Sequence, residues 1–114
     1  MTATAPYRWC TLYVDAKDQP VITAELARLL GPPSDLDVFT PPGFTVEVRR
    51  NPDHTAGPHF LDWPTVVEID ALARVPDTEV VAFVTRVIDH LRLAAQRVAA
   101  ESDFVEHLPP PDHR

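Results

Sequence analysis

Residues 44–69 read FTVEVRRNPDHTAGPHFLDWPTVVEI, and this stretch decides the fold. Apolar and polar residues alternate from Phe44 to Arg49 and again from Trp63 to Asp70, on either side of a polar, turn-rich segment at 51–62. Alternation with a period of two is typical of a β-strand with one buried and one solvated face. The stretch therefore predicts a β-hairpin, and the polar face of this hairpin is mostly carboxylate.

The residues before the hairpin predict a strand, a helix and a loop. Residues 7–14 are apolar on both faces, which is typical of a central strand, and this pattern leaves open which face is buried. Residues 22–30 have the spacing of a short amphipathic helix that ends at Gly31. Residues 32–43 contain four prolines and are expected to form a loop.

The residues after the hairpin predict a second helix and a last strand. The helix starts near Pro76, with Asp77 as its N-cap. Its core-facing stripe has helical spacing and consists of Val80, Val84, Val87, Ile88, Leu91 and Ala95. Residues 98–104 predict a strand, with an extension of the helix as the alternative. The order β-α-β-β-α-β is that of a ferredoxin-like α+β fold, a four-stranded antiparallel sheet with two helices on one face.

The length and composition bound the possible architecture and partners. The 114 residues suit a single domain spanning 1–114, with flexible ends at 1–6 and 109–114. The net charge of −7 argues against nucleic acid or an anionic membrane as a partner and permits a basic protein. Cys10 is the single cysteine, which fits a cytoplasmic protein without an internal disulfide. No signal peptide or membrane span is expected.

The polar face of the sheet is the candidate site. The strands place carboxylates from three segments on one face, which predicts an acidic docking surface for a basic protein. An ordinary solvated sheet face is the alternative. The predicted partner-binding residues are Glu47, Arg49, Glu68, Asp70, Glu101 and Asp103 on the strands, with Asp53 and His54 from the hairpin loop. Trp9 and Trp63 are expected to pack in the core.

Motifs for catalysis, metal binding or cofactor binding do not emerge from the sequence. The spacing of His54 and His59 matches no established ligand pattern. Cys10 lies within a strand, where burial makes a thiol inert. Glu68 and Glu101 could share a proton as an acid–base pair, but nothing indicates a cleft around them. We therefore predict no catalytic residues, no metal and no cofactor, which favours a protein that is not an enzyme and leaves an enzyme as the alternative.

Four segments carry a resemblance to a known group of proteins. They are LYVDA at 12–16, TVEVRRNPD at 45–53, FLDWPTVVEID at 60–70 and ESDFVEHLP at 101–109. With them the chain resembles a family of small bacterial α/β proteins grouped with toxin-immunity proteins. The resemblance implies a compact protein without catalytic activity that binds a partner polypeptide. It offers no catalytic residues to carry over.

The sequence supports two functional hypotheses from different classes. The first is a non-enzymatic binding protein, of the immunity type, that neutralises a basic toxin through the acidic sheet face. The second is a small dimeric enzyme or ligand-binding protein in which two ferredoxin-like sheets stack. Charge on the sheet face disfavours the second, because like charges would meet across the interface. The sequence leaves open whether the protein is a monomer or a homodimer.

Overall fold

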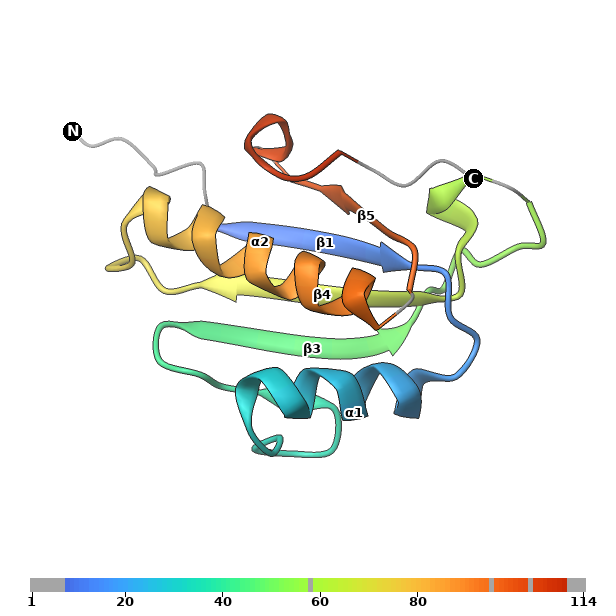
Figure 1. The fold of residues 1–114 in the computed structure, drawn as a ribbon, viewed down its shortest axis with the longest axis horizontal. Helices are drawn as coiled ribbons and strands as arrows, with labels where there is room; N and C mark the ends of the chain where they lie inside the picture. The colour runs from blue at the N-terminus through green and yellow to red at the C-terminus, as the bar shows by residue number, and fades with distance from the viewer. Residues whose placement is uncertain (1–7, 58, 95, 103, 111–114) are drawn as a thin grey trace.

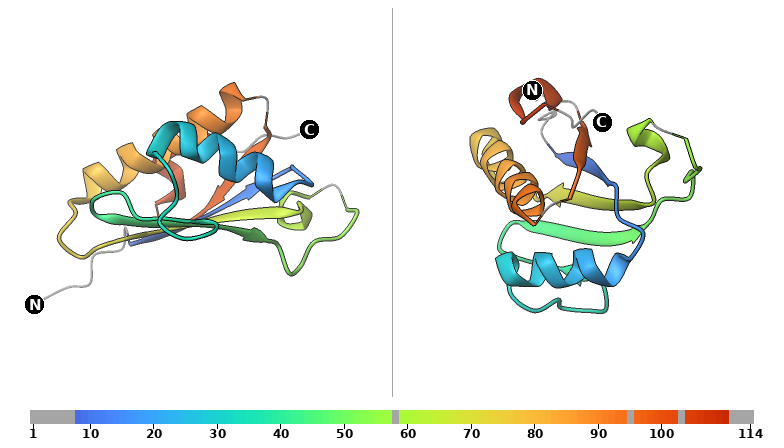
Figure 2. Two further views of the ribbon diagram at one scale, coloured as in Figure 1. Left: turned by 90° about the horizontal axis from the view of Figure 1, so that it is seen from below. Right: turned by 45° about the vertical axis from the view of Figure 1, so that its right-hand side comes forward.

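A five-stranded antiparallel sheet, covered on one face by two helices, forms the body of the molecule (Figure 1). The computed structural model describes residues 8–110 except 58, 95 and 103. The strands are β1 (Trp9–Val14), β2 (Val38–Phe39), β3 (Phe44–Arg50), β4 (Thr65–Ala71) and β5 (Val98–Glu101), in the spatial order β2-β3-β4-β1-β5. The helices are α1 (Gln19–Leu30) and α2 (Asp77–Leu93). Figure 2 shows that both lie on the same side of the sheet, so its other face is free of helices.

The α+β class is confirmed, but the strand count is wrong. The additional strand, β2, lies within the proline-rich segment expected to be a loop, where Val38 pairs with Glu47 and Phe39 pairs with Val46. Phe39 is buried, so this short strand is held by tertiary packing. The chain then turns at Gly43, whose φ of +89° favours glycine and where a Cβ would lie 2.8 Å from Cγ2 of Val75.

The predicted hairpin is confirmed, although its second strand begins at Thr65 and not at Trp63. Val46 lies opposite Ile69 and Val48 opposite Val67, and all four side chains are buried against the helices. Each side chain between them points to the opposite face, as the period-two pattern predicts. β4 is the middle strand of the sheet and β1 is an interior strand between β4 and β5, which explains why β1 is apolar on both sides.

The structure decides which face of β1 is buried. Cys10, Leu12 and Val14 lie in the core beneath the helices, so the alternate residues face outward. Trp9 is 40% exposed, and its expected place in the core is therefore wrong. Trp63 is buried, as expected, but it lies outside the main core cluster.

The helices differ from the prediction mainly at their ends. α1 begins at Gln19 because Pro20 is compatible with the first turn of a helix. The N-cap position of α2 belongs to Pro76, and Asp77 is the first helical residue. α2 buries the predicted stripe, apart from Ala95, which lies outside the described residues. None of the helices in the described part of the chain has the length and apolar character needed to cross a membrane.

The last predicted strand is a strand and does not extend the helix, although it is shorter than expected. β5 ends at Glu101, because the chain turns at Ser102, whose hydroxyl accepts a hydrogen bond from the Phe104 amide at 3.2 Å. Phe104 and Leu108 then pack into the core. Residues 1–6 and 111–114, expected to be flexible, lie outside the described residues, as do Tyr7 and Asp103.

Candidate functional site

Every second residue of four strands lies on the face of the sheet that the two α-helices leave free, here called the open face. β1 contributes its odd-numbered residues and β4 its even-numbered ones, as the burial pattern and the strand register require. The side chains on the open face are Trp9, Thr11, Tyr13, Thr45, Glu47, Arg49, Val66, Glu68, Asp70, Ala99 and Glu101. The structure thus brings together five of the predicted partner-binding residues, whereas Asp103 lies outside the described residues.

Carboxylates meet on neighbouring strands of the open face. Glu47 lies directly opposite Glu68, an arrangement that is unfavourable for two like charges. Arg49 compensates in part by forming an ion pair with Glu68. Asp70 stays exposed, and partial burial together with the nearby Glu68 charge raises its pKa. The face therefore keeps a net negative charge.

Thr11 is a small residue at the centre of this charge. It lies opposite Glu68 on β4 and opposite Glu101 on β5, so a carboxylate stands on each side of it. Trp9 and Tyr13 are two positions away along the same strand and on the same face. Direct cross-strand neighbours are about 5 Å apart and next-but-one residues of a strand about 7 Å apart. Two carboxylates and two aromatic rings thus surround one small side chain.

Tyr13 fixes one of these carboxylates. Its hydroxyl donates a hydrogen bond to Oε1 of Glu101 across a distance of 3.1 Å. Burial, followed by the charge of Glu101, raises the pKa of Tyr13 to about 12. The phenol therefore stays protonated at neutral pH and remains a hydrogen-bond donor.

The hairpin loop, residues 51–64, covers one end of the open face. The ring of Phe60 lies 5.6 Å from that of Tyr13, and Trp63 contacts Phe60 edge-on at 6.4 Å. The guanidinium of Arg97 lies 4.9 Å from the centre of the Trp63 ring and also binds Asp15. These contacts leave the other end, with Trp9, open.

Asp53 and His54 are the predicted site residues in this loop, and in the structure they have different neighbours. The charge of Asp53 contributes to the raised pKa of Tyr13, so Asp53 lies near this end of the open face. His54 instead places Nδ1 2.6 Å from the carbonyl oxygen of Asp62 and lines hollows that it shares with Lys17. His54 therefore does not belong to the acidic face.

The described residues offer no group of three His, Cys, Asp or Glu side chains that could hold a metal ion. His59 accepts a hydrogen bond from the Leu61 amide at Nδ1 and stacks on Phe60. Cys10 lies on the helix-covered face, where burial raises the pKa of its thiol to about 12. Such a thiol has little thiolate at neutral pH.

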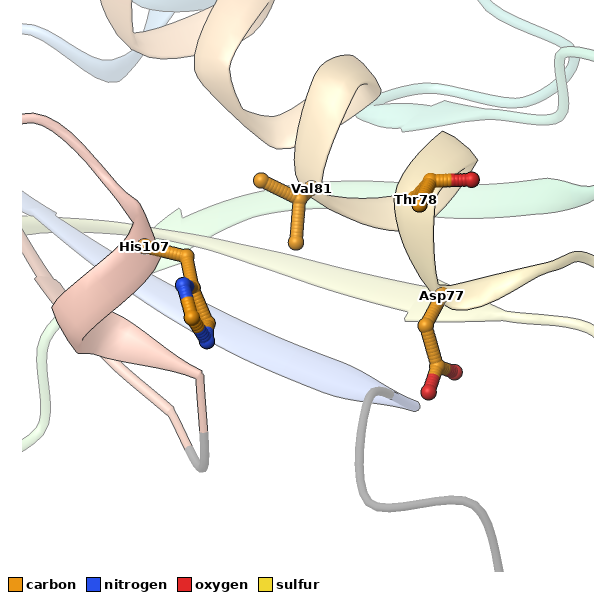
Figure 3. Close-up of a pocket in the computed structure, with 4 residues that line it drawn as sticks. All are labelled: Asp77, Thr78, Val81 and His107. Carbon is orange, nitrogen blue, oxygen red and sulfur yellow. The ribbon is translucent and has the colours of Figure 1, made fainter.

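A separate hollow of about 440 Å³ lies between the start of α2 and the short helix at Val105–His107 (Figure 3). Asp77, Thr78, Val81 and His107 line it. The Asp77 carboxylate accepts a hydrogen bond from Arg8 at 3.2 Å. No sequence pattern predicts this hollow, because Asp77 has the pattern of a helix cap and His107 belongs to no recognisable motif.

Comparison with known proteins finds no matching family model, no similar curated protein and no similar solved structure. The arrangement on the open face therefore carries the functional argument by itself.

Proposed function

We propose that this protein is a non-enzymatic binding module that docks a basic polypeptide on its open face. The proposal rests on the neighbours of Thr11. Glu68 and Glu101 lie on either side of it, and Trp9 and Tyr13 lie along the same strand. A lysine or arginine side chain laid over Thr11 would meet a carboxylate on both sides and an aromatic ring at both ends.

The chemistry of these groups favours a cation over any other ligand. A carboxylate pairs with an ammonium or guanidinium group, and aromatic faces attract the same groups through their quadrupole. The ion pair between Arg49 and Glu68 is an example within the chain itself, because a carboxylate of the open face already binds a guanidinium group there. Trp9, with 40% of its surface exposed, is the natural anchor for the apolar stem of such a side chain.

We propose further that the module acts as an immunity protein that masks the basic active site of a toxin. The resemblance of four segments to that class motivates this form of the proposal. Electrostatic attraction to a face with net negative charge would speed the encounter. A cytosolic location, which the single buried cysteine fits, belongs to the same proposal.

A second copy of the chain is a poorer occupant of the open face. Among the residues that the structure describes, neither Glu47 nor Asp70 has an ion-pair partner, and stacking two such faces would bring like charges together. We also propose that the fold is ferredoxin-like with one added edge strand. The order β5-β1-β4-β3, with a helix in each crossover, supports this assignment.

A binding experiment tests the proposed function. The ligands are a hexalysine peptide and the product of the neighbouring gene, and surface plasmon resonance at several salt concentrations follows the rates. The association rate should fall steeply with salt, since exposed charges are screened. Trp9→Ala should raise the dissociation rate about tenfold, as expected for an interface anchor, and Glu101→Gln should slow association.

Asp89→Asn is the matched control, because it also removes one exposed carboxylate but lies on α2, away from the open face. It should leave both rates close to those of the natural protein. A salt-independent association rate, or an equal loss with Asp89→Asn and Glu101→Gln, would refute docking on the open face. Light scattering of the free protein separates this reading from a face-to-face dimer.

A further inference from the structure

A small hollow near the hairpin loop gathers a lysine, an arginine and a histidine from three separate segments. Lys17 comes from the turn between β1 and α1, Arg50 ends β3, and His54 lies in the loop that follows. These segments meet at the right-hand end of the sheet in Figure 1. Gln19 and Pro64 complete the lining of the hollow, whose volume is about 170 Å³.

The cations in this hollow lack acidic partners. Within the described part of the chain, neither Lys17 nor Arg50 forms an ion pair, although the protein carries a net charge of −7. None of the described residues that line the hollow is a carboxylate. Asp18, the N-cap residue of α1, is exposed and is not part of the lining. Unpaired like charges that share a small space repel one another, and a bound anion would relieve that repulsion.

His54 is oriented by the loop itself. Its Nδ1 lies 2.6 Å from the carbonyl oxygen of Asp62, which can only accept a hydrogen bond. Nδ1 must therefore carry the proton, and Nε2 is left for another partner. Gln19, also in the lining, is the first residue of α1, at the positive end of the helix dipole.

We propose that this hollow binds the phosphate group of a small molecule. Guanidinium and ammonium groups are the usual protein partners of phosphate. The hollow is smaller than the roughly 300–1,000 Å³ of sites that enclose a whole ligand, so it suits a head group. An adjoining hollow of about 390 Å³ shares Lys17, His54 and Pro64 with it and has room for an organic part. Asp15, bound to Arg97, and Asp62 line only that second hollow, which keeps the anion in the first.

This site is independent of the proposed function, because it lies outside the acidic face and uses none of the four residues around Thr11. Its test is a nuclear magnetic resonance titration of the full chain, labelled with ¹⁵N, against inorganic phosphate and against glycerol 3-phosphate. Sodium chloride at matched ionic strength is the reference. Saturable shifts are expected at the amides of Lys17, Gln19, Arg50 and His54. Tighter binding of glycerol 3-phosphate would assign a phosphorylated small molecule, and equal binding would assign free phosphate.

Variants at exposed positions decide between this site and general charge attraction. Lys17→Ala and Arg50→Ala should each weaken phosphate binding about tenfold, as the loss of one charge-assisted hydrogen bond predicts. Lys17→Arg should retain it, and Arg74→Ala, which removes an exposed arginine elsewhere, should leave it unchanged. Shifts no larger than those in chloride, or equal losses with Arg74→Ala and Arg50→Ala, would overturn the proposal.

Discussion

Tyr13 links the hairpin loop to the centre of the open face. Its ring packs on Phe60 of the hairpin loop, and its hydroxyl holds Glu101 beside Thr11. The carboxylate accepts this bond only while the phenol is protonated. Burial and the Glu101 charge raise the pKa of Tyr13 to about 12, so the bond is intact throughout the neutral range.

Titration of Tyr13 provides the prediction at this scale. In a Tyr7→Phe background Tyr13 is the single tyrosine, and tyrosinate absorbance should rise with a midpoint near pH 12. Adding Glu101→Gln should lower the midpoint, because a neighbouring negative charge disfavours the phenolate. Asp89→Asn, on α2, should leave it unchanged. A midpoint at the ordinary value near 10 would contradict the contact between Tyr13 and Glu101.

The hairpin loop is the element that shapes the candidate site, and one buried amide holds it. The side chain of Asn51 donates hydrogen bonds to the carbonyls of Leu61 at 2.9 Å and Trp63 at 2.7 Å, and it accepts one from the Asp53 amide at 2.9 Å. Asn51 is only 3% exposed. Both ends of the loop and its predicted site residue Asp53 are thus fixed by a single side chain.

Asn51→Ala should therefore lower the free energy of unfolding by about 1–3 kcal/mol, because it leaves buried polar groups without partners. Chemical denaturation measures this loss, and hydrogen exchange should show faster opening of the loop amides. Thr55→Ala is the control in the same loop, since its exposed hydroxyl accepts one bond, from Gly57. That change should cost less than about 0.5 kcal/mol. Similar losses in both variants would show that Asn51 does not hold the loop.

Elements with a clear period could be predicted from the sequence, and elements fixed by tertiary contacts could not. Strands β3 and β4 alternate cleanly, so the pattern predicts both strands and the residues that share each face, whereas their pairing register is known only from the structure. β1 is apolar on both sides, so only its place between β4 and β5 decides that Trp9 faces outward. β2 has two residues and no period, because pairing with β3 creates it.

The candidate site, like the fold, could be predicted from the sequence only in part. Four carboxylates, Glu47, Glu68, Asp70 and Glu101, share the open face as predicted, because each follows the strand alternation, whereas Asp103 lies outside the described residues. The role of Thr11 depends on register across three strands, which no local pattern contains. His54 was assigned to the acidic face from its position in the chain. The path of the loop, set by Asn51, places it among cations instead.

At the scale of the whole molecule, the open face gathers negative charges that do not stabilise the fold. Glu47 faces Glu68 across the strands, and the pKa of Asp70 is raised, so its charged form is disfavoured in the folded state. A group whose pKa is raised on folding weakens the fold at every pH where it is ionised. Proteins that break such a local rule often do so at functional sites and compensate for it elsewhere.

The double variant Glu47→Gln, Asp70→Asn should consequently be more stable than the natural protein while it binds basic peptides less well. The expected gain in the free energy of unfolding is on the order of 0.5 kcal/mol, the size of an unfavourable cross-strand charge pair. The part of this gain that comes from Asp70 should disappear as the pH falls below about 4, where the carboxyl is protonated in both states. High salt should reduce the gain by screening. Asp89→Asn, measured in parallel by thermal unfolding, should show no such change. A double variant that loses stability would mean that these carboxylates support the fold, and the open face would then need no partner to account for its charge.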